Sequence, residues 1–184
     1  MTNNWLETLY PSNAERTTPW PELEGGTVTL WRPVGEQELA LIAQSGYRAF
    51  PPRLPDQPIF YPVLNFTYAE EIARNWNAKR NTPPVGFVTE FEVIASVATR
   101  YEIQIVGIAN LHQELWVPAE ELAAFNAAIL APIRVVAHYT GEGYARQIDL
   151  VSHLSLDLEG WLWRALSMSV SASPILWVMN PNRA

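Results

Sequence analysis

The stretch FVTEFEV, residues 87–93, decides the fold class of this chain. Successive side chains of a β-strand point to opposite faces, so residues of one kind at every second position indicate a strand with two unlike faces. The stretch has this pattern, with Phe87, Thr89, Phe91 and Val93 on one face and Glu90 and Glu92 on the other. One apolar face and one solvated face are typical of antiparallel sheets. The sequence therefore predicts a largely antiparallel sheet.

Further strands and helices are expected on both sides of this stretch. Alternating patterns predict strands near residues 27–32, 59–64, 101–106, 111–117, 133–139 and 148–151. Apolar residues at helical spacing predict about three helices, which begin after Pro33, at a Thr67 cap and at Pro118. Gly46 is the expected stop of the first helix. The second helix would bury the stripe Ala69, Ile72, Ala73 and Trp76. This order of elements favours an α+β fold over a doubly wound one.

The length of 184 residues fits one domain. Residues 1–26 are rich in Asn, Thr, Pro and Glu without a sustained period, and they are expected to form an arm ahead of the domain. The α+β domain is expected to span residues 27–184, and its pattern weakens into a less regular C-terminal extension from about residue 145.

The charge of the chain limits the partners that it can bind. A formal net charge of -7 repels phosphate backbones and anionic membrane surfaces, so nucleic acid is not an expected partner. Lys79 is the only lysine, which argues against a phosphate-binding loop or a Schiff-base lysine. Arginine supplies the other positive charges, and its rigid fork suits bidentate contact with phosphate or carboxylate. A small anionic ligand therefore remains a suitable partner.

The sequence also bears on the compartment. There is no cysteine, so disulfides and thiolate sites are excluded. Residues 1–10 lack the basic cluster and apolar core of a signal peptide. Residues 161–178 are apolar, but Arg164, four serines and Pro174 interrupt them, which does not match a membrane span. We therefore expect a soluble cytoplasmic protein without a membrane partner.

His112 and Glu114 are candidate catalytic residues, and Trp116 is a candidate binding residue beside them. The three alternate along the predicted strand 111–117, so their side chains share one face. A carboxylate beside an imidazole could polarise a ribose hydroxyl or stabilise positive charge that develops on a sugar ring. The alternative is that the three residues form the solvated face of an edge strand.

Arg32 is a candidate ligand-binding residue at the end of the predicted strand 27–32. It shares a face with apolar residues, and a guanidinium near a core needs an anionic partner. That partner is either a ligand or a protein carboxylate, most simply Glu36. Tyr61 and Tyr68 flank a proline-rich loop and could line a cleft, although aromatic residues at such places also pack in cores.

A metal site is the least supported of the sites that the sequence allows. Two imidazoles and a carboxylate, from His112, His138 and Glu114, would suit a divalent metal if their strands were neighbours. No recognised ligand motif is present, so no metal site is predicted.

Several segments together resemble one protein family. They are TLWRPVGEQELALIAQSGYRAFPPRLPDQPIFYPVLN, YAEEIARNWN, GFVTEFEV, HQELWVPAEELAAFN and IRVVAHYT, and they cover roughly residues 29–144. The family consists of small bacterial proteins catalogued under ADP-ribosylation and crystallin names. The same name also denotes an all-helical ADP-ribosyl-glycohydrolase with aspartate-rich metal motifs, which this strand-rich chain lacks. The layout instead resembles an ADP-ribosyltransferase-like fold.

This resemblance implies a site for NAD. In such folds an Arg or His on an early strand, polar or aromatic groups on a middle strand and a Glu on a late strand surround NAD. By resemblance, Arg32 would hold a phosphate or ribose, and Tyr61 or Tyr68 would stack on the nicotinamide. Glu114 would stabilise the cationic ribose, and His112 stands where many transferases carry Gln or Glu.

We therefore expect a protein that binds NAD or ADP-ribose, with ADP-ribosyltransferase or NAD-cleaving activity as the implied chemistry. A non-catalytic binding or interaction module is the alternative, and a small metal-dependent enzyme is the third possibility. The ligand would be a small nucleotide, and nothing in the sequence specifies a protein acceptor.

Overall fold

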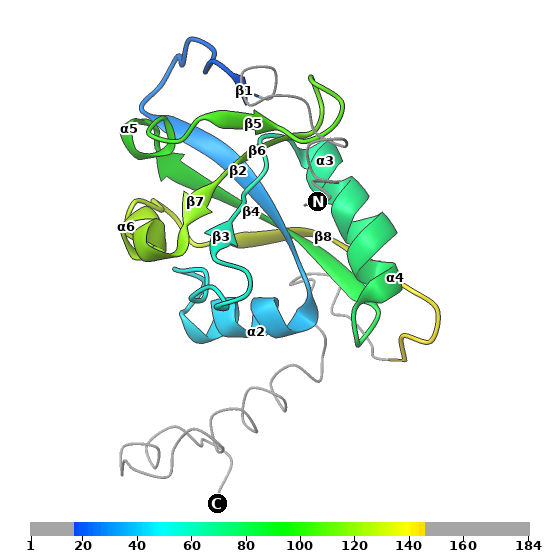
Figure 1. Ribbon diagram of the computed structural model, residues 1–184. Coiled ribbons are helices and arrows are strands. Elements are labelled where there is room, and N and C mark those ends of the chain that lie inside the picture. The colour runs from blue at the N-terminus through cyan, green and yellow to red at the C-terminus, as the bar shows by residue number, and fades with distance from the viewer. Residues whose placement is uncertain (1–16, 146–184) are drawn as a thin grey trace, which may run out of the picture.

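Strand β4 (Val85–Ile94) contains the stretch FVTEFEV and pairs on both sides with antiparallel strands (Figure 1). Its partners are β2 (Thr27–Val34) and β8 (Arg134–Thr140). The structure is a computed structural model that describes residues 17–145. Phe87 is fully buried and Glu92 is exposed, so the two faces of β4 differ in the predicted sense.

A second antiparallel sheet is joined to the first through one residue. Its strands are β1 (Thr17–Thr18), β5 (Ile103–Ile105) and β6 (Gln113–Leu115), and a two-stranded sheet combines β3 (Ile59–Phe60) with β7 (Val117–Pro118). Val63 forms isolated bridges to Trp31 on one side and to Glu114 on the other. The two larger sheets are therefore continuous across Val63, and the expected antiparallel α+β domain is confirmed.

Helical segments account for the three helices expected from the sequence and add one short turn. They are α2 (Glu36–Gln44), α3 (Phe66–Ile72), a π-helical turn (Ala73–Asn77), α4 (Ala78–Arg80), α5 (Ala95–Ala98), a 3-10 turn (Ala119–Glu121) and α6 (Leu122–Ala127). Residues 66–80 form one continuous helical segment, as do residues 119–127. Only α5, which has four residues, was not expected.

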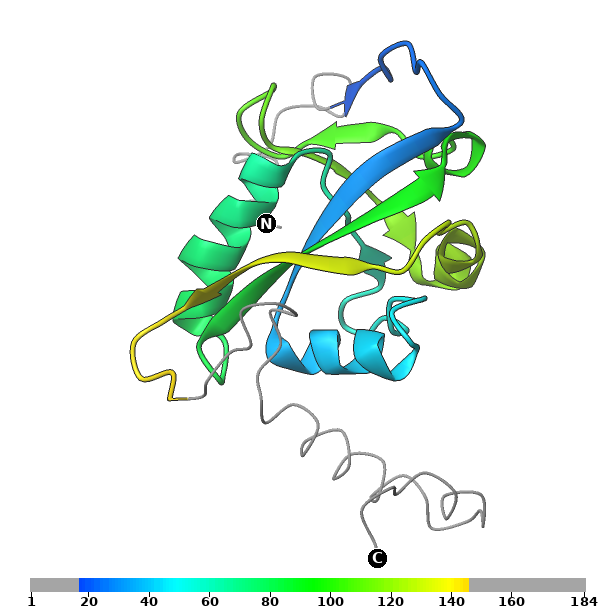
Figure 2. The same cartoon turned by 180° about the vertical axis from the view of Figure 1, so that it is seen from behind.

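The sheet packs against helices on both faces. Apolar residues of α2 and α6 join the aromatic side chains of the main core, which include Phe60, Phe87 and Phe125. A smaller core on the other side contains Val63, Val88 and two alanines of the α3 segment. The two views in Figures 1 and 2 show the α3 to α4 segment and α6 on opposite sides of the strands.

The α3 segment differs from the sequence expectation in its cap and in one buried position. Asn65, not Thr67, is the N-cap, and its side chain accepts a hydrogen bond from the Tyr68 amide at 2.8 Å. Trp76 is 55% exposed instead of buried. The π-helical turn adds a residue to the helical repeat and rotates the following side chains, so the regular spacing no longer predicts the buried face.

Two glycines explain how the helices meet the sheet. At Gly86 a side chain would collide with the carbonyl oxygen of Ala73, so the close approach of the α3 segment to β4 requires glycine. Gly46, the expected stop of α2, has a φ of 69°, and its amide bonds the carbonyl of Ala43 at 2.9 Å. This left-handed position ends the helix as predicted.

The expected N-terminal arm and C-terminal extension are only partly described. Strand β1 lies within residues 1–26 and pairs with β5, so the sheet begins earlier than residue 27. The strand expected at residues 148–151 and the extension after residue 145 lie outside the described residues.

Candidate functional site

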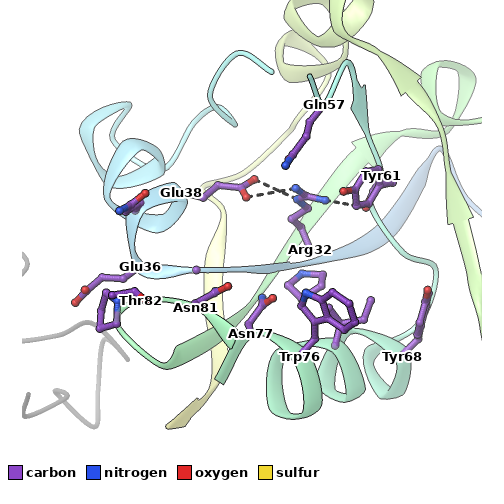
Figure 3. Close-up of a pocket in the computed structure, with 15 residues that line it drawn as sticks. Arg32, Glu36, Glu38, Gln57, Tyr61, Tyr68, Trp76, Asn77, Asn81 and Thr82 are labelled. Carbon is purple, nitrogen blue, oxygen red and sulfur yellow. Dashed lines mark hydrogen bonds and ion pairs between the residues drawn. The ribbon is translucent and has the colours of Figure 1, made fainter. Parts of the chain in front are cut away.

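A cleft of ≈ 870 Å³ opens where the end of β2, the start of α2 and the segment from α3 to α4 meet (Figure 3). This volume lies within the range of about 300–1,000 Å³ that is usual for small-molecule sites. Aromatic rings, side-chain amides and charged groups line it. They are Tyr61, Tyr68 and Trp76; Gln37, Gln57, Asn77 and Asn81; and Arg32, Glu36 and Glu38.

Arg32 is held at the cleft by β2 and by an ion pair. Thr89 donates its hydroxyl to the Arg32 carbonyl oxygen at 2.8 Å. The guanidinium contacts both carboxylate oxygens of Glu38, at 3.1 Å from Nε and 3.3 Å from Nη2, and Nη1 donates to the Tyr61 carbonyl at 3.2 Å. The carboxylate that pairs with Arg32 is therefore Glu38 and not Glu36. Residues two apart on a helix point in different directions, so only one of these two acids can face Arg32.

Arg53 belongs to the same charge cluster, although it was not among the residues predicted from the sequence. Its Nε donates to the Ile59 carbonyl at 3.0 Å and its Nη2 to Gln57 at 3.4 Å. Its Nη1 lies 3.9 Å from Glu38. Burial lowers the pKa of the Arg53 guanidinium below its ordinary value, and the nearby charge of Arg32 acts in the same direction. The sequence feature that could have identified Arg53 as a site residue is its position inside a stiff proline-rich loop.

The aromatic side chains of the cleft are placed beside cations. The Arg32 guanidinium lies 4.8 Å from the centre of the Tyr61 ring, and that of Arg53 lies 5.9 Å from it. Trp76 carries the guanidinium of Arg80 over its ring at 3.7 Å. Tyr61 is 39% exposed, so its ring is accessible to a ligand. The structure thus places Arg32, Tyr61 and Tyr68 around one cleft.

His112 is paired with a different carboxylate from the one that the sequence suggested. Its Nε2 lies 3.1 Å from Glu71, and its ring lies 4.6 Å from the ring of Tyr68. The Ile108 amide donates to Nδ1 at 3.1 Å, so Nδ1 is the unprotonated nitrogen and Nε2 donates to Glu71. The predicted imidazole and carboxylate pair of His112 and Glu114 is therefore replaced by His112 and Glu71.

Glu114 and Trp116 form a pair of their own. The indole Nε1 of Trp116 donates to the Glu114 carboxylate at 2.6 Å, and Glu114 is only 9% exposed. Strand β6 pairs with β5 on one side and with Val63 on the other, so Glu114 is not on an edge strand. The alternative of a solvated edge-strand face is therefore wrong for this residue.

The register of the chain shows how close this pair comes to the cleft. Three backbone hydrogen bonds keep residues 58–64 antiparallel to residues 113–119, and they link Leu64 to Gln113, Leu115 to Pro62 and Ala119 to Pro58. In this register Tyr61 lies opposite Trp116, so the two side chains share a face. Neither Glu114 nor Trp116 is among the residues that line the cleft.

The residues considered for a metal do not come together. His138 lies on β8, 6.5 Å from the ring of Phe87, whereas His112 precedes β6. Strands β4 and β2 separate β8 from the sheet that contains β6. Within residues 17–145, no group of three or more His, Cys, Asp or Glu side chains could hold a metal ion.

Among the helices of residues 17–145, none is long and apolar enough to cross a membrane. No protein-family model matches the chain, and neither does any curated protein or solved structure.

Proposed function

We propose that the cleft binds a nucleotide of the NAD or ADP-ribose class. The observation that carries this proposal is the meeting of Arg32, Tyr61 and Tyr68 around a single cleft of ≈ 870 Å³. A nucleotide of this class combines flat rings, sugar hydroxyls and phosphate groups. The cleft offers aromatic rings, side-chain amides and a guanidinium, so each part of the ligand has a chemically suitable partner.

The aromatic rings and the side-chain amides of the cleft suit different parts of the ligand. The exposed rings of Tyr61 and Trp76 suit stacking of a base or a nicotinamide, because every such ring has a π-face. Asn77 and Asn81 reach the cleft from the helical wall, and Gln57 reaches it from the opposite side (Figure 3). Their amides can donate to and accept from ribose hydroxyls.

A second candidate function is cleavage of NAD, with Glu114 as the group that stabilises the cationic ribose. The observation that favours it is the register that sets Tyr61 opposite Trp116, which in turn bonds Glu114. Because Glu114 does not line the cleft and accepts a hydrogen bond from Trp116, catalysis would require a movement that brings its carboxylate to the ligand. Binding without chemistry needs no such movement, so the first candidate stands ahead of the second.

Replacing Tyr61 with Leu tests the proposed binding. We expect isothermal titration calorimetry to detect ADP-ribose and NAD binding to the full chain, and Tyr61→Leu to weaken both by about tenfold or more. Loss of a stacking ring costs about 1–3 kcal/mol, and 1.4 kcal/mol corresponds to a factor of ten in affinity.

Phe66→Leu is the matched control, because Phe66 is also an exposed aromatic residue but does not line the cleft. It should leave both affinities unchanged. If neither nucleotide binds at millimolar concentration, or if the two variants weaken binding equally, the proposal is wrong. A non-catalytic interaction module would then be the better description.

A further inference from the structure

Arg32, Arg53 and Glu38 form a charge cluster between the proline-rich loop and α2. Arg32 and Glu38 line the cleft (Figure 3), and Arg53 lies on the other side of Glu38's ion pair, outside the lining residues. The side chains of the two arginines are 6% and 7% exposed, and that of Glu38 is 21% exposed. Two guanidiniums share a single carboxylate. The cluster therefore holds one positive charge in excess in a place with little contact with water.

The groups around this cluster do not remove the excess charge. Tyr61 contributes a neutral carbonyl and ring, and Gln57 contributes a neutral amide. Glu36 also lines the cleft, but Figure 3 shows its side chain directed away from Arg32, whereas Glu38 points toward it. The depressed pKa of Arg53, caused first by burial and then by the charge of Arg32, agrees with two cations held close together.

The guanidinium of Arg32, which lines the cleft, keeps hydrogen-bonding capacity. A guanidinium carries five N–H donors. Within residues 17–145, Arg32 uses its Nε and one donor from each terminal nitrogen for Glu38 and the Tyr61 carbonyl. Nη1 of Arg53 lies 3.9 Å from Glu38, beyond hydrogen-bond length. Arg32, which lines the cleft, can thus donate to a further acceptor, whereas Arg53 does not line the cleft and adds a positive charge beside Glu38.

We infer that this charge cluster is an anion subsite that takes the pyrophosphate part of a nucleotide, and that Glu38 competes with the ligand for the guanidinium fork of Arg32. This inference deepens the proposed function and rests on it for the nucleotide. An incoming phosphate balances the excess charge and uses the bidentate geometry that Glu38 now occupies. Without a ligand, the Glu38 carboxylate pairs with the guanidiniums of Arg32 and Arg53. When a phosphate binds, Glu38 competes with it and weakens its binding.

Inorganic pyrophosphate is the probe, because it has the charge of the ligand without its rings. We expect Glu38→Gln to tighten pyrophosphate binding by about tenfold or more in isothermal titration calorimetry, since a charged competitor has been removed. Pyrophosphate should also raise the melting temperature of Glu38→Gln more than that of the wild type, because the variant has two cations without a carboxylate.

Glu92→Gln is the matched control, since it makes the same change in charge at an exposed position of β4. Equal pyrophosphate affinity in the two variants would overturn the inference. Malonate supplies the second arm of the test, as a carboxylate of similar size. Tighter binding of malonate than of pyrophosphate would overturn the assignment to phosphate.

Arg53→Gln tests the subsite independently and remains informative if Glu38→Gln does not fold. It should weaken pyrophosphate binding by about tenfold, whereas Arg134→Gln, at a side chain that is 70% exposed, should not change it. No effect of Arg53→Gln would overturn the inference. Pyrophosphate binding without ADP-ribose binding would support the subsite and contradict the nucleotide, so the two proposals fail separately.

Discussion

The charge cluster of Arg32, Arg53 and Glu38 and the pair of Glu114 and Trp116 both place a buried charge beside an aromatic ring, but they differ in what they leave for a ligand. Arg32 lines the cleft and uses three of its five N–H donors for acceptors within residues 17–145. Glu114 is turned toward the indole of Trp116 and does not reach the cleft. A buried charge therefore indicates a binding site only where it also faces an open cavity.

The largest expected effect is a loss of stability when the charge cluster is broken. Arg32→Leu leaves the partly buried Glu38 without its bidentate partner, so it should lower the free energy of unfolding by about 3 kcal/mol in urea denaturation. Arg134→Leu removes an ion pair with Glu90 at an exposed side chain and should cost less than about 1 kcal/mol. Equal costs for the two variants would show that the cluster around Arg32 contributes no more than a surface ion pair.

The sequence predicted the elements of this molecule better than the side-chain partners. The alternation of FVTEFEV and the glycine at position 46 are local signals, and the strand and the helix end follow from them. The exposure of Trp76 could not be predicted, because nothing in the local spacing marks the π-helical turn at residues 73–77.

The candidate site depends on contacts between distant segments, and this limits prediction from sequence. Arg32 and Tyr61 could be named because each has a local reason to be near a core or a loop. Arg53 was missed although it lies in a stiff proline-rich loop, because its pairing follows from the way this loop folds back to Glu38. Glu71, which lies 41 residues before His112, became the partner of that imidazole only through the packing of α3 on the sheet.

The second expected effect concerns Glu114 and tests whether the pair of Glu114 and Trp116, unlike the charge cluster, is without influence on ligand binding. Glu114→Gln exchanges an ionised acceptor of the Trp116 indole for a neutral one, which should cost about 1 kcal/mol of stability. Because Glu114 lies outside the cleft, the ADP-ribose affinity of the variant should stay within about twofold of the wild type. This is less than the loss expected when a hydrogen bond to the ligand is removed. Calorimetry and urea denaturation measure the two quantities.

Nicotinamide release provides the readout that a purely structural role would not change. If wild-type protein releases nicotinamide from NAD and Glu114→Gln does not, while ADP-ribose affinity is kept, Glu114 is the catalytic group and binding alone is not the function. Trp116→Phe is the companion variant, because it keeps an aromatic ring but cannot donate to Glu114. A large loss of ADP-ribose affinity in Glu114→Gln would contradict the placement of Glu114 outside the cleft.

The smallest expected effect comes from Tyr101 and Glu121, a polar pair that belongs to neither region and serves as a structural reference. The Tyr101 hydroxyl donates to Glu121 at 2.7 Å. Burial, followed by the hydrogen bond to Glu121, raises the pKa of Tyr101 to about 12, above its ordinary value of about 10. The folded chain therefore holds this proton more tightly than the unfolded chain does.

The sign of the pH dependence follows from this difference. The contribution of Tyr101 to stability is complete below about pH 10 and is lost as the pH rises toward about 12. Tyr101→Phe has no proton to lose, so its stability difference from the wild type should narrow over this interval, by less than about 1 kcal/mol because the pair is partly exposed. Tyr47 and Tyr139, whose pKa values are also raised, are present in both proteins and cancel. Urea denaturation between pH 8 and pH 11.5 measures the difference, and a constant gap would contradict a raised pKa for Tyr101.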